Sequence, residues 1–375
     1  MDQSELSAWL RLLLTPGVGP AKARQLLAAF GSPQAVFDAP LSDLKNVVSA
    51  RDAASLSCVP ADWADHMAAT QAWLCGSSRP EEGQREILSL ADTRYPRRLL
   101  ETPDPPLLLF VQGQLSLLDR PSVAVVGSRS PTAQGRDNAR AFSQALSEAG
   151  VTVVSGLAQG IDGAAHEGAL AAQGPGVGST LAVVGTGLDR VYPRAHLDLA
   201  RRIAERGLLV SEFLLGTPPA PANFPKRNRI VAGLTRGTLV IEAAVQSGSL
   251  ITARLAAEMG REVLAIPGSI HSPQSRGCHA LIKQGAKLVE TAQDVLEELH
   301  LEGADMAPAS ATPDTATESG DPILAAMGFD PVSQEALSAR TGMGPAQLGA
   351  RLLELELMGQ VARLPGQLFQ RCAQG

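Results

Sequence analysis

Cysteine is scarce in this sequence, and its placement excludes two structural roles. None of the cysteines forms a C-x-x-C pair, so neither a zinc site nor a disulfide framework is indicated, and a reducing compartment is expected. They are Cys58, Cys75, Cys278 and Cys372. The amino terminus carries Asp2 and Glu5 where a secretory signal needs Lys or Arg. No uninterrupted apolar run approaches the ~18 residues of a membrane span. The sequence therefore predicts a cytoplasmic protein without membrane insertion.

Two cofactor signatures are also missing. A dinucleotide enzyme needs G-x-G-x-x-G directly after its first strand, but residues 127–131 read G-S-R-S-P, and the G-T-G at 185–187 lacks the third glycine. The Walker pattern G-x-x-x-x-G-K-[ST] does not occur either. A nicotinamide enzyme is therefore disfavoured, ATP hydrolysis of the P-loop kind has no support, and we expect neither a cofactor nor a metal.

Charge is unevenly distributed along the 375 residues, whose formal net charge is -6. Residues 120–290 contain 18 Lys and Arg against 12 Asp and Glu, whereas the rest of the chain contains 14 against 26. A basic middle between acidic ends is typical of an internal anion-binding domain, although arginine-rich surfaces without a ligand also occur.

The densest group of cations is the stretch F-P-K-R-N-R-I at residues 224–230. Lysine provides a point charge, each arginine a planar fork that fits phosphate or guanine, and asparagine a donor-acceptor pair for a base edge. Nucleic acid is the leading interpretation. The alternative is a basic helix start on a solvated face.

Four segments are expected along the chain. Residues 1–74 show short helical patterns broken by Gly and Pro, which indicates a small helical domain of SAM-like or helix-hairpin-helix type. Residues 75–302 are expected to form the main domain. Residues 303–320, rich in Ala, Pro, Ser and Thr, are expected to be a flexible linker. Residues 321–375 give three helical patterns and two short strands, as in a winged-helix domain.

Within the main domain, short β-rich runs alternate with helical stretches. This alternation predicts an α/β fold with a doubly wound, mostly parallel sheet of extended Rossmann-like type. In such sheets ligands bind beyond the carboxyl ends of the strands, so the loops that follow them form the candidate site. After a first strand at 107–111, the runs are 123–126, 151–155, 181–184, 208–210, 239–242 and 263–266.

The loops after these strands combine glycine with polar residues. Glycine lets backbone amides approach an anion closely, and helix N-termini add partial positive charge. We expect a cleft that follows a phosphate chain, in which cations attract the strand and loop amides fix its phosphates. The amides are those of Gly127, Ser128 and Gly160. The candidate DNA-binding residues are Gly127, Ser128, Arg129, Gln159, Gly160, Phe224, Lys226, Arg227, Asn228, Arg229, Gly248 and Ser249.

Individual roles follow from the side chains. Lys226, Arg227 and Arg229 are expected to draw the strand in, and Arg129 and Asn228 to reach base edges. Phe224 could stack on an unpaired base, a contact worth ~1–3 kcal/mol in single-strand binders, with core packing as an equal alternative. Because aromatic residues make up only 3% of the chain, stacking is not expected to be the main contribution.

Four carboxylates follow strands, a position suited to a general acid or base. They are Asp162, Asp189, Glu212 and Glu242. Asp162 and His166 are four residues apart on one expected helix, but no nucleophile motif accompanies them. A structural role, in capping helices or bracing loops, is the preferred interpretation for this group.

The two end domains give weaker signals. The T-P-G-V-G-P at 15–20 is similar to the turn of a helix-hairpin-helix, and Lys22 and Arg24 suit phosphate binding there. An inert packing unit is an equal alternative. In the tail, Arg351 is opposed by Glu354 and Glu356, a charge pattern poorly suited to a major groove, so a protein-protein role is favoured.

Five motifs occur in order along the main domain. Residues 127–135 are similar to G-[ST]-R-x-x-[ST]-x-Y-G, residues 155–166 match S-G-x-A-x-G-I-D-x-x-A-H, and residues 185–193 match G-x-G-x-D-x-x-Y-P. F-P-x-R-N-R-I is matched at 224–230 and S-G-S-L-I-T-A at 247–253. With the three-part layout, these motifs make nearly the whole chain resemble the bacterial DNA-processing protein A family (DprA, also called Smf).

This resemblance implies a non-enzymatic protein that binds and shields single-stranded DNA and helps load RecA recombinase in natural transformation and recombination. It also implies a homodimer formed through the α/β domain. The sequence departs from the family pattern at Gln134, where tyrosine is usual, and at His196 and His279, where asparagine is common. These departures affect the expected loop packing and leave the basic and glycine positions intact.

The main rival is a nucleotide-binding phosphoribohydrolase-like enzyme on a similar doubly wound domain, with the motif P-G-G-x-G-T-x-x-E. Aligning Gly248 and Ser249 with the glycine-threonine pair of that motif puts Thr252 in the place of its glutamate. The carboxylate that this chemistry requires is therefore missing, which disfavours the enzyme.

Overall fold

The structure is a computed structural model that describes residues 1–76, 83–174, 176–301, 321–327 and 331–372. The expected linker, residues 303–320, lies outside the described residues. Within the described ranges, no helix is both long and apolar enough to cross a membrane.

The amino-terminal part is helical, as predicted. Polar caps start several of its helices: Asp2 accepts a hydrogen bond from the Glu5 amide, and Ser32 and Ser49 cap two later helices in the same way. The helices are α1 (Gln3–Leu14), α2 (Pro20–Phe30), α3 (Pro33–Asp38), α4 (Leu41–Leu44), α5 (Ala50–Leu56) and α6 (Trp63–Cys75).

The main domain is built on a nine-stranded sheet in the order β1-β2-β6-β5-β4-β3-β7-β8-β9. Strands β3 to β9 pair in parallel, whereas β1 pairs with β2, and β2 with β6, in antiparallel fashion. The mostly parallel sheet is confirmed, and β1 and β9 were not predicted. The strands are β1 (Arg85–Ser89), β2 (Leu108–Gly113), β3 (Ser122–Val126), β4 (Thr152–Ser155), β5 (Thr180–Val183), β6 (Leu208–Ser211), β7 (Gly237–Val240), β8 (Glu262–Ala265) and β9 (Lys287–Leu288).

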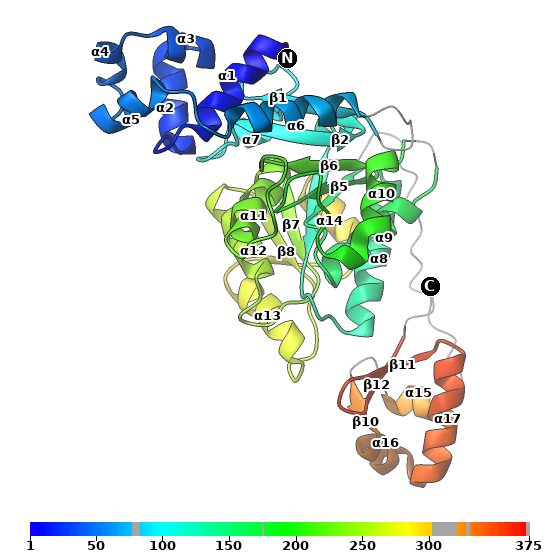
Figure 1. Cartoon of the computed structure of the whole chain (residues 1–375). Coiled ribbons are helices and arrows are strands. Elements are labelled where there is room, and N and C mark those ends of the chain that lie inside the picture. Colours follow the sequence, from blue (N-terminus) through cyan, green and yellow to red (C-terminus); the bar gives the residue numbers. More distant parts are fainter. Residues whose placement is uncertain (77–82, 175, 302–320, 328–330, 373–375) are drawn as a thin grey trace.

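Helices cover both faces of this sheet (Figure 1). Alternate residues of β3 show why: Val123 and Val125 pack with one group of helices, and Ala124 and Val126 with the other. One face carries α8 (Ala133–Glu148), α9 (Ile161–Ala171), α10 (Leu197–Arg206) and α14 (Ala292–Glu298). The other carries α7 (Arg97–Leu100), α11 (Asn223–Leu234), α12 (Ser249–Glu258) and α13 (Arg276–Lys283). Short 3-10 turns lie at Leu115–Leu118, Arg194–His196 and Pro273–Ser275.

The strand order reverses at β3. The chain proceeds from β3 through β4 and β5 to β6 on one side, then crosses to β7, β8 and β9 on the other. In doubly wound sheets, the loops on either side of such a reversal separate and leave a crevice for a ligand. The loops after β3, β4 and β7 are therefore expected to border the ligand-binding crevice.

The helical domain shares a core with the sheet. Trp73 of α6 meets Phe110 of β2 edge to face, with ring centroids 6.0 Å apart. Buried residues of α1 and α2 belong to the same apolar cluster as Leu108 and Leu209 of the sheet. Such packing holds the helical domain against the strand edge that carries β1 and β2.

The carboxyl-terminal part is a winged-helix domain. Leu337, Leu348 and Leu352 lie in its buried core. The three predicted helices and two strands are present, and a further short strand, β10, was missed. The elements are α15 (Pro322–Met327), β10 (Val332–Ser333), α16 (Gln334–Thr341), α17 (Pro345–Leu357), β11 (Val361–Leu364) and β12 (Leu368–Arg371).

Candidate functional site

A cleft of about 700 Å³ opens at the carboxyl ends of the strands, where the strand order reverses. Its walls come from the loops after β3, β4 and β7 and from the first turns of α11 and α12. Eight predicted site residues line it: Gly127, Ser128, Arg129, Phe224, Arg227, Asn228, Gly248 and Ser249. A smaller recess of about 90 Å³ adjoins the cleft and contains Gln159. Cleft and recess share Arg129, Tyr192, Phe224 and Arg227 among their lining residues.

Arg227 is a buried cation rather than the surface cation that the sequence suggested. Its side chain extends from α11 over the ends of β4 and β5, and the residue is only 4% exposed. One guanidinium nitrogen, Nη1, donates to the Val183 carbonyl at 3.0 Å, while Nε has no partner. Gly156 makes this position possible, because a Cβ there would overlap the guanidinium. Burial lowers the pKa of Arg227, and the nearby Asp162 carboxylate opposes that shift.

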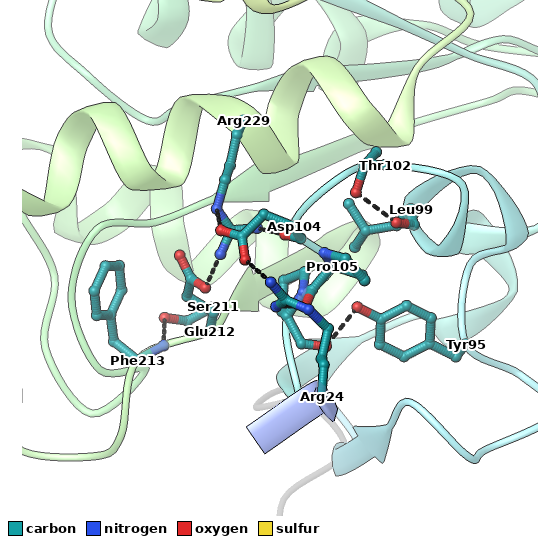
Figure 2. A network of polar contacts seen from close by, with 11 residues as sticks. Arg24, Tyr95, Leu99, Thr102, Asp104, Pro105, Ser211, Glu212, Phe213 and Arg229 are labelled. Atoms are coloured by element: carbon teal, nitrogen blue, oxygen red, sulfur yellow. Dashed lines mark hydrogen bonds and ion pairs between the residues drawn. The ribbon is translucent and has the colours of Figure 1, made fainter. Parts of the chain in front are cut away.

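Arg229, two residues further on, lies outside the cleft. It forms ion pairs with Glu212 after β6 and with Asp104 in the loop before β2. Asp104 also binds Arg24 of α2 at 2.6 Å, and Arg24 donates to the Pro105 carbonyl as well. Figure 2 shows these four charged side chains joined in one chain of contacts, which we call the interdomain network: Arg24, Asp104, Arg229 and Glu212.

The network corrects the sequence-based role of Arg229. Because the Asp104 and Glu212 carboxylates both pair with Arg229, its charge is neutralised inside the protein and is not available to a DNA strand. Lys226 is exposed but lines neither the cleft nor the recess. The three cations of residues 224–230 thus lie in three places. Arg227 lines the cleft, Arg229 belongs to the interdomain network, and Lys226 lies on the outer surface.

Arg129 is the exposed cation of the cleft. Its guanidinium carbon lies 5.3 Å from the centroid of the Phe224 ring, within the range of a cation-π contact. Phe224 also packs against Tyr192, with centroids 5.7 Å apart and planes inclined by 38°. Sequence reasoning missed Tyr192, although it is the tyrosine of the G-x-G-x-D-x-x-Y-P pattern matched at residues 185–193.

No carboxylate lies within ion-pair distance of Arg129 or Arg227 among the residues that the structure describes. Asp162 is the only acidic residue among the described lining of the cleft. Two arginines against one carboxylate leave the cleft with a net positive charge, which favours an anionic ligand.

The loop after β4 is held by Asp162 and His166 of α9. Asp162 accepts hydrogen bonds from the amides of Gly156 and Ala158 at 3.2 and 3.4 Å, and His166 Nε2 accepts from the Leu157 amide at 3.3 Å. Burial raises the pKa of Asp162, opposed by Arg227 and by the two amides. Both side chains thus support the loop, and neither is placed as a free acid or base.

In the structure, two of the residues predicted to bind phosphates make other contacts. The Ser128 amide already donates to the Glu242 carbonyl at 2.7 Å, so it is not free for a phosphate. Gly160 has φ +84° and lies so close to the loop after β3 that a Cβ would overlap the Ser128 carbonyl. Gly160 therefore allows two loops to pack together, and it lines neither cavity. A phosphate contact of Gly127 stays a prediction.

The amino terminus of α12 forms the opposite wall of the cleft. The hydroxyls of Ser247 and Ser249 are 2.7 Å apart, and the Asn228 amide group donates to the Gly248 carbonyl at 3.5 Å. These contacts join the start of α12 to α11. They place Asn228, Gly248 and Ser249 together, as the sequence predicted.

The remaining carboxylates brace loops. Glu242 accepts from the amide and hydroxyl of Thr132, the cap of α8, and burial raises its pKa. Asp189 accepts from the Gly216 amide at 2.8 Å. Glu212 belongs to the interdomain network. The structural interpretation of these residues agrees with their contacts.

Cations of the end domains are also engaged internally. Lys22 binds the Gly17 carbonyl and the Asp52 carboxylate, which lies against the hairpin turn. In the winged-helix domain, Arg351 pairs with Asp321 and Glu354. These contacts favour the packing interpretation of the hairpin over phosphate binding.

The departures from the family pattern have local partners. His196 Nδ1 bonds to the Leu157 carbonyl at 3.0 Å, and His279 Nε2 to the Gly268 carbonyl at 2.9 Å. Gln134 donates to Asn138 within α8. Leu157, whose φ is +58°, is therefore held by histidines on both its amide and its carbonyl.

With this geometry established, comparison with known proteins assigns the class. Residues 86–300 match the family described as DNA recombination-mediator protein A, residues 307–367 match the DprA winged helix domain, and residues 3–60 match the DprA-like N-terminal HHH domain. The chain belongs to the DNA recombination-mediator protein A family, whose members are DNA-processing proteins.

Individual relatives agree with this assignment. Protein Smf of Escherichia coli is 43% identical over 296 residues, covering 76% of this chain and 77% of its own length. The X-ray structure of DNA processing protein A from Streptococcus pneumoniae aligns with a TM-score of 0.66 and 38% identity, over 80% of this chain and 98% of that one. DNA processing protein A from Helicobacter pylori, whose structure concerns a single-stranded DNA binding mode, gives a TM-score of 0.53 at 29% identity, over 59% and 97%.

Proposed function

We propose that this protein binds single-stranded DNA in the cleft. The observation that carries the proposal is the pair Arg129 and Arg227, which line one cleft without a carboxylate partner among the described residues. Phosphates would supply the missing anions for the guanidinium groups that line the cleft. The Helicobacter pylori relative, described as binding single-stranded DNA, supports the same ligand class.

Electrostatics dominates the proposed affinity. Each phosphate neutralised on a single strand releases counterions, so the logarithm of the binding constant should fall with the logarithm of salt concentration by about 0.7 per contact. Single strands are preferred because their bases are accessible to side chains, whereas duplex bases are stacked and paired.

The test is fluorescence anisotropy with a labelled oligonucleotide, single-stranded and duplex, over a salt series. Wild type is compared with Arg129→Ala and with the matched control Arg202→Ala, which removes an equal charge from an exposed position on α10 outside the cleft. We expect Arg129→Ala to weaken binding and to reduce the salt slope by about 0.7. Equal behaviour of both variants would move the site elsewhere, and a flat salt response would exclude the electrostatic account.

We further propose that the bound strand is shielded and then passed to RecA, as the family resemblance implies. The checks are nuclease protection of the strand and the rate at which limiting RecA assembles on it with and without this protein. Arg129→Ala should lose both effects together if one cleft serves both. RecA assembly that is unaffected by wild type at saturating DNA binding would reject the loading step alone.

Dimerisation through the α/β domain is a third proposal. Strand β9 is an edge of the sheet, and its Leu288 is 43% exposed, so a second copy could cover it. Light scattering should give a dimer for wild type and a monomer for Leu288→Asp. A wild-type monomer at all concentrations tested would reject the proposal.

Among the described residues that line the cleft, there is no free carboxylate to serve the rival enzyme. Thr252 lines the wall where the phosphoribohydrolase pattern needs glutamate, and Asp162 is engaged with two amides. If the purified protein released the base from a nucleoside monophosphate, the phosphoribohydrolase interpretation would be favoured again. This assay therefore accompanies the binding measurements.

A further inference from the structure

Tyr192 is an unusual residue in this protein. Among the described residues it is the only aromatic side chain with nearly half of its surface exposed, at 47%, while the other described aromatic rings are buried or partly buried. An accessible aromatic ring offers the kind of face on which unpaired bases stack in single-strand binders. Tyr192 stands where the cleft meets the recess and lines both.

Phe224, the aromatic residue that the sequence suggested for stacking, is already packed. The Arg129 guanidinium lies over its ring at 5.3 Å and the Tyr192 ring lies beside it at 5.7 Å. Its residual exposure is intermediate. The ring that remains accessible to a ligand is therefore that of Tyr192, with Phe224 behind it as a support.

Charge and ring face are close together at this point. Arg129 and Arg227 also line both cavities, so a phosphate bound by either arginine lies within the same space as the tyrosine ring. In single-strand binders, an aromatic platform beside a cationic groove takes a base on its face while the groove takes the backbone.

We propose that Tyr192 is the stacking platform for an unpaired base of the bound strand, and that Phe224 positions its ring. The inference rests on the proposed function and deepens it: it assigns one base contact within a mainly electrostatic site. The contact does not depend on base identity, because every base has a π-face, and it requires a base that is not paired and stacked in a duplex.

The experiment compares Tyr192→Ala and Tyr192→Phe with wild type, using anisotropy of a labelled oligodeoxythymidylate. Tyr192→Ala should bind about tenfold more weakly, within the range of base stacking on aromatic residues. Tyr192→Phe keeps the ring and should stay within about twofold of wild type on the same stacking argument. The matched control is Leu197→Ala, which truncates another exposed apolar residue, 38% exposed, outside both cavities.

Two further readouts separate stacking from other roles. The salt slope should be unchanged in Tyr192→Ala, because no phosphate contact is lost, whereas Arg129→Ala lowers it. A strand in which the bases are replaced by abasic sites should bind wild type more weakly than the normal strand, and this difference should shrink in Tyr192→Ala.

The outcomes are distinguishable from those of the proposed function. If wild type binds no single strand, both the function and the inference fail. If wild type binds and Tyr192→Ala binds equally well, the cleft proposal stands and the stacking inference is overturned. A loss that is equal in Tyr192→Phe and Tyr192→Ala would assign the effect to the hydroxyl and would also overturn it.

Discussion

Arg227 and Arg229 are two residues apart on α11, yet they belong to two different kinds of environment. Arg229 is part of the interdomain network, where it is paired with Glu212 and Asp104. Arg227 lines the cleft, with one hydrogen bond to a carbonyl and an unpartnered Nε. The comparison teaches that a cluster of cations in sequence is not a cluster of binding groups. What decides the role of each arginine is whether the protein supplies its counter-charge.

The largest effect is expected from a substitution of Arg229 in the interdomain network. Arg229→Met leaves Glu212, whose side chain is only 13% exposed, without its cationic partner. We expect the free energy of unfolding to fall by about 3 kcal/mol, because removing one member of a largely buried ion pair leaves an uncompensated charge. Urea unfolding of both proteins measures the difference.

The control for this prediction is Arg202→Met, an exposed arginine on α10 that should change the free energy of unfolding by at most about 0.5 kcal/mol. Adding Glu212→Gln to Arg229→Met should restore part of the loss, because the unpaired carboxylate is then gone. An Arg229→Met protein as stable as wild type would mean that the network does not hold the two domains together.

The second prediction tests the cleft side with the same substitution two residues earlier. Arg227→Met should weaken single-strand binding by about 2 kcal/mol, roughly thirtyfold, the typical value of a hydrogen bond to a charged group. Its free energy of unfolding should fall less than that of Arg229→Met, since Arg227 has no ion-pair partner among the described residues and makes a single hydrogen bond to a carbonyl. Anisotropy and urea unfolding of the same preparation check both.

The opposite pattern would break the comparison. If Arg227→Met unfolds as easily as Arg229→Met and binds DNA normally in its folded fraction, both arginines are structural. The positive charge of the cleft would then reduce to Arg129.

Local patterns were enough to predict most of the fold. The six runs from Val123 onward and the winged-helix elements follow from periodicity and from glycine or proline at their ends. Strand β1 was missed because R-E-I-L-S begins with two charged residues, and its pairing with β2 joins residues about twenty positions apart, such as Ile87 and Phe110. Strand β9 has only two residues and is defined by its neighbour, β8. Pairing across the sheet is not encoded in a local pattern.

The site was predicted as a set of loops but not as a set of roles. Residue types placed Arg129, Asn228 and Ser249 in one cleft correctly. Burial of Arg227 depends on the space left by Gly156, and pairing of Arg229 depends on Asp104, 125 residues earlier in the chain. Contacts of that kind arise only when the helical domain, the loop before β2 and α11 are assembled.

The loops of the cleft and the interdomain network are held by different kinds of interaction. His166 is fully buried, and its Nε2 accepts the Leu157 amide, so Nδ1 carries the proton and faces Thr180 at 2.7 Å. Burial, together with the neighbouring His196 and Arg227, lowers the pKa of His166 to about 3. A neutral imidazole therefore supports the loop after β4, whereas ion pairs support the interdomain network.

The smallest expected effect follows from that difference and appears as a pH dependence. Because the pKa of His166 in the folded protein lies below its ordinary value of 6.5, the unfolded chain takes up the proton more readily. This contribution to stability is complete above pH 6.5 and is lost as the pH falls toward 3. The slope should approach about 1.4 kcal/mol per pH unit.

His166→Gln, which keeps a donor and an acceptor, should remove that slope, and the exposed His271→Gln should retain it. Unfolding in urea between pH 6.5 and about 5.5, above the ordinary range of carboxyl titration, gives the comparison. An unchanged slope in His166→Gln would show that the acid sensitivity does not come from this imidazole, and would remove the distinction between a loop held by neutral hydrogen bonds and a domain contact held by charge.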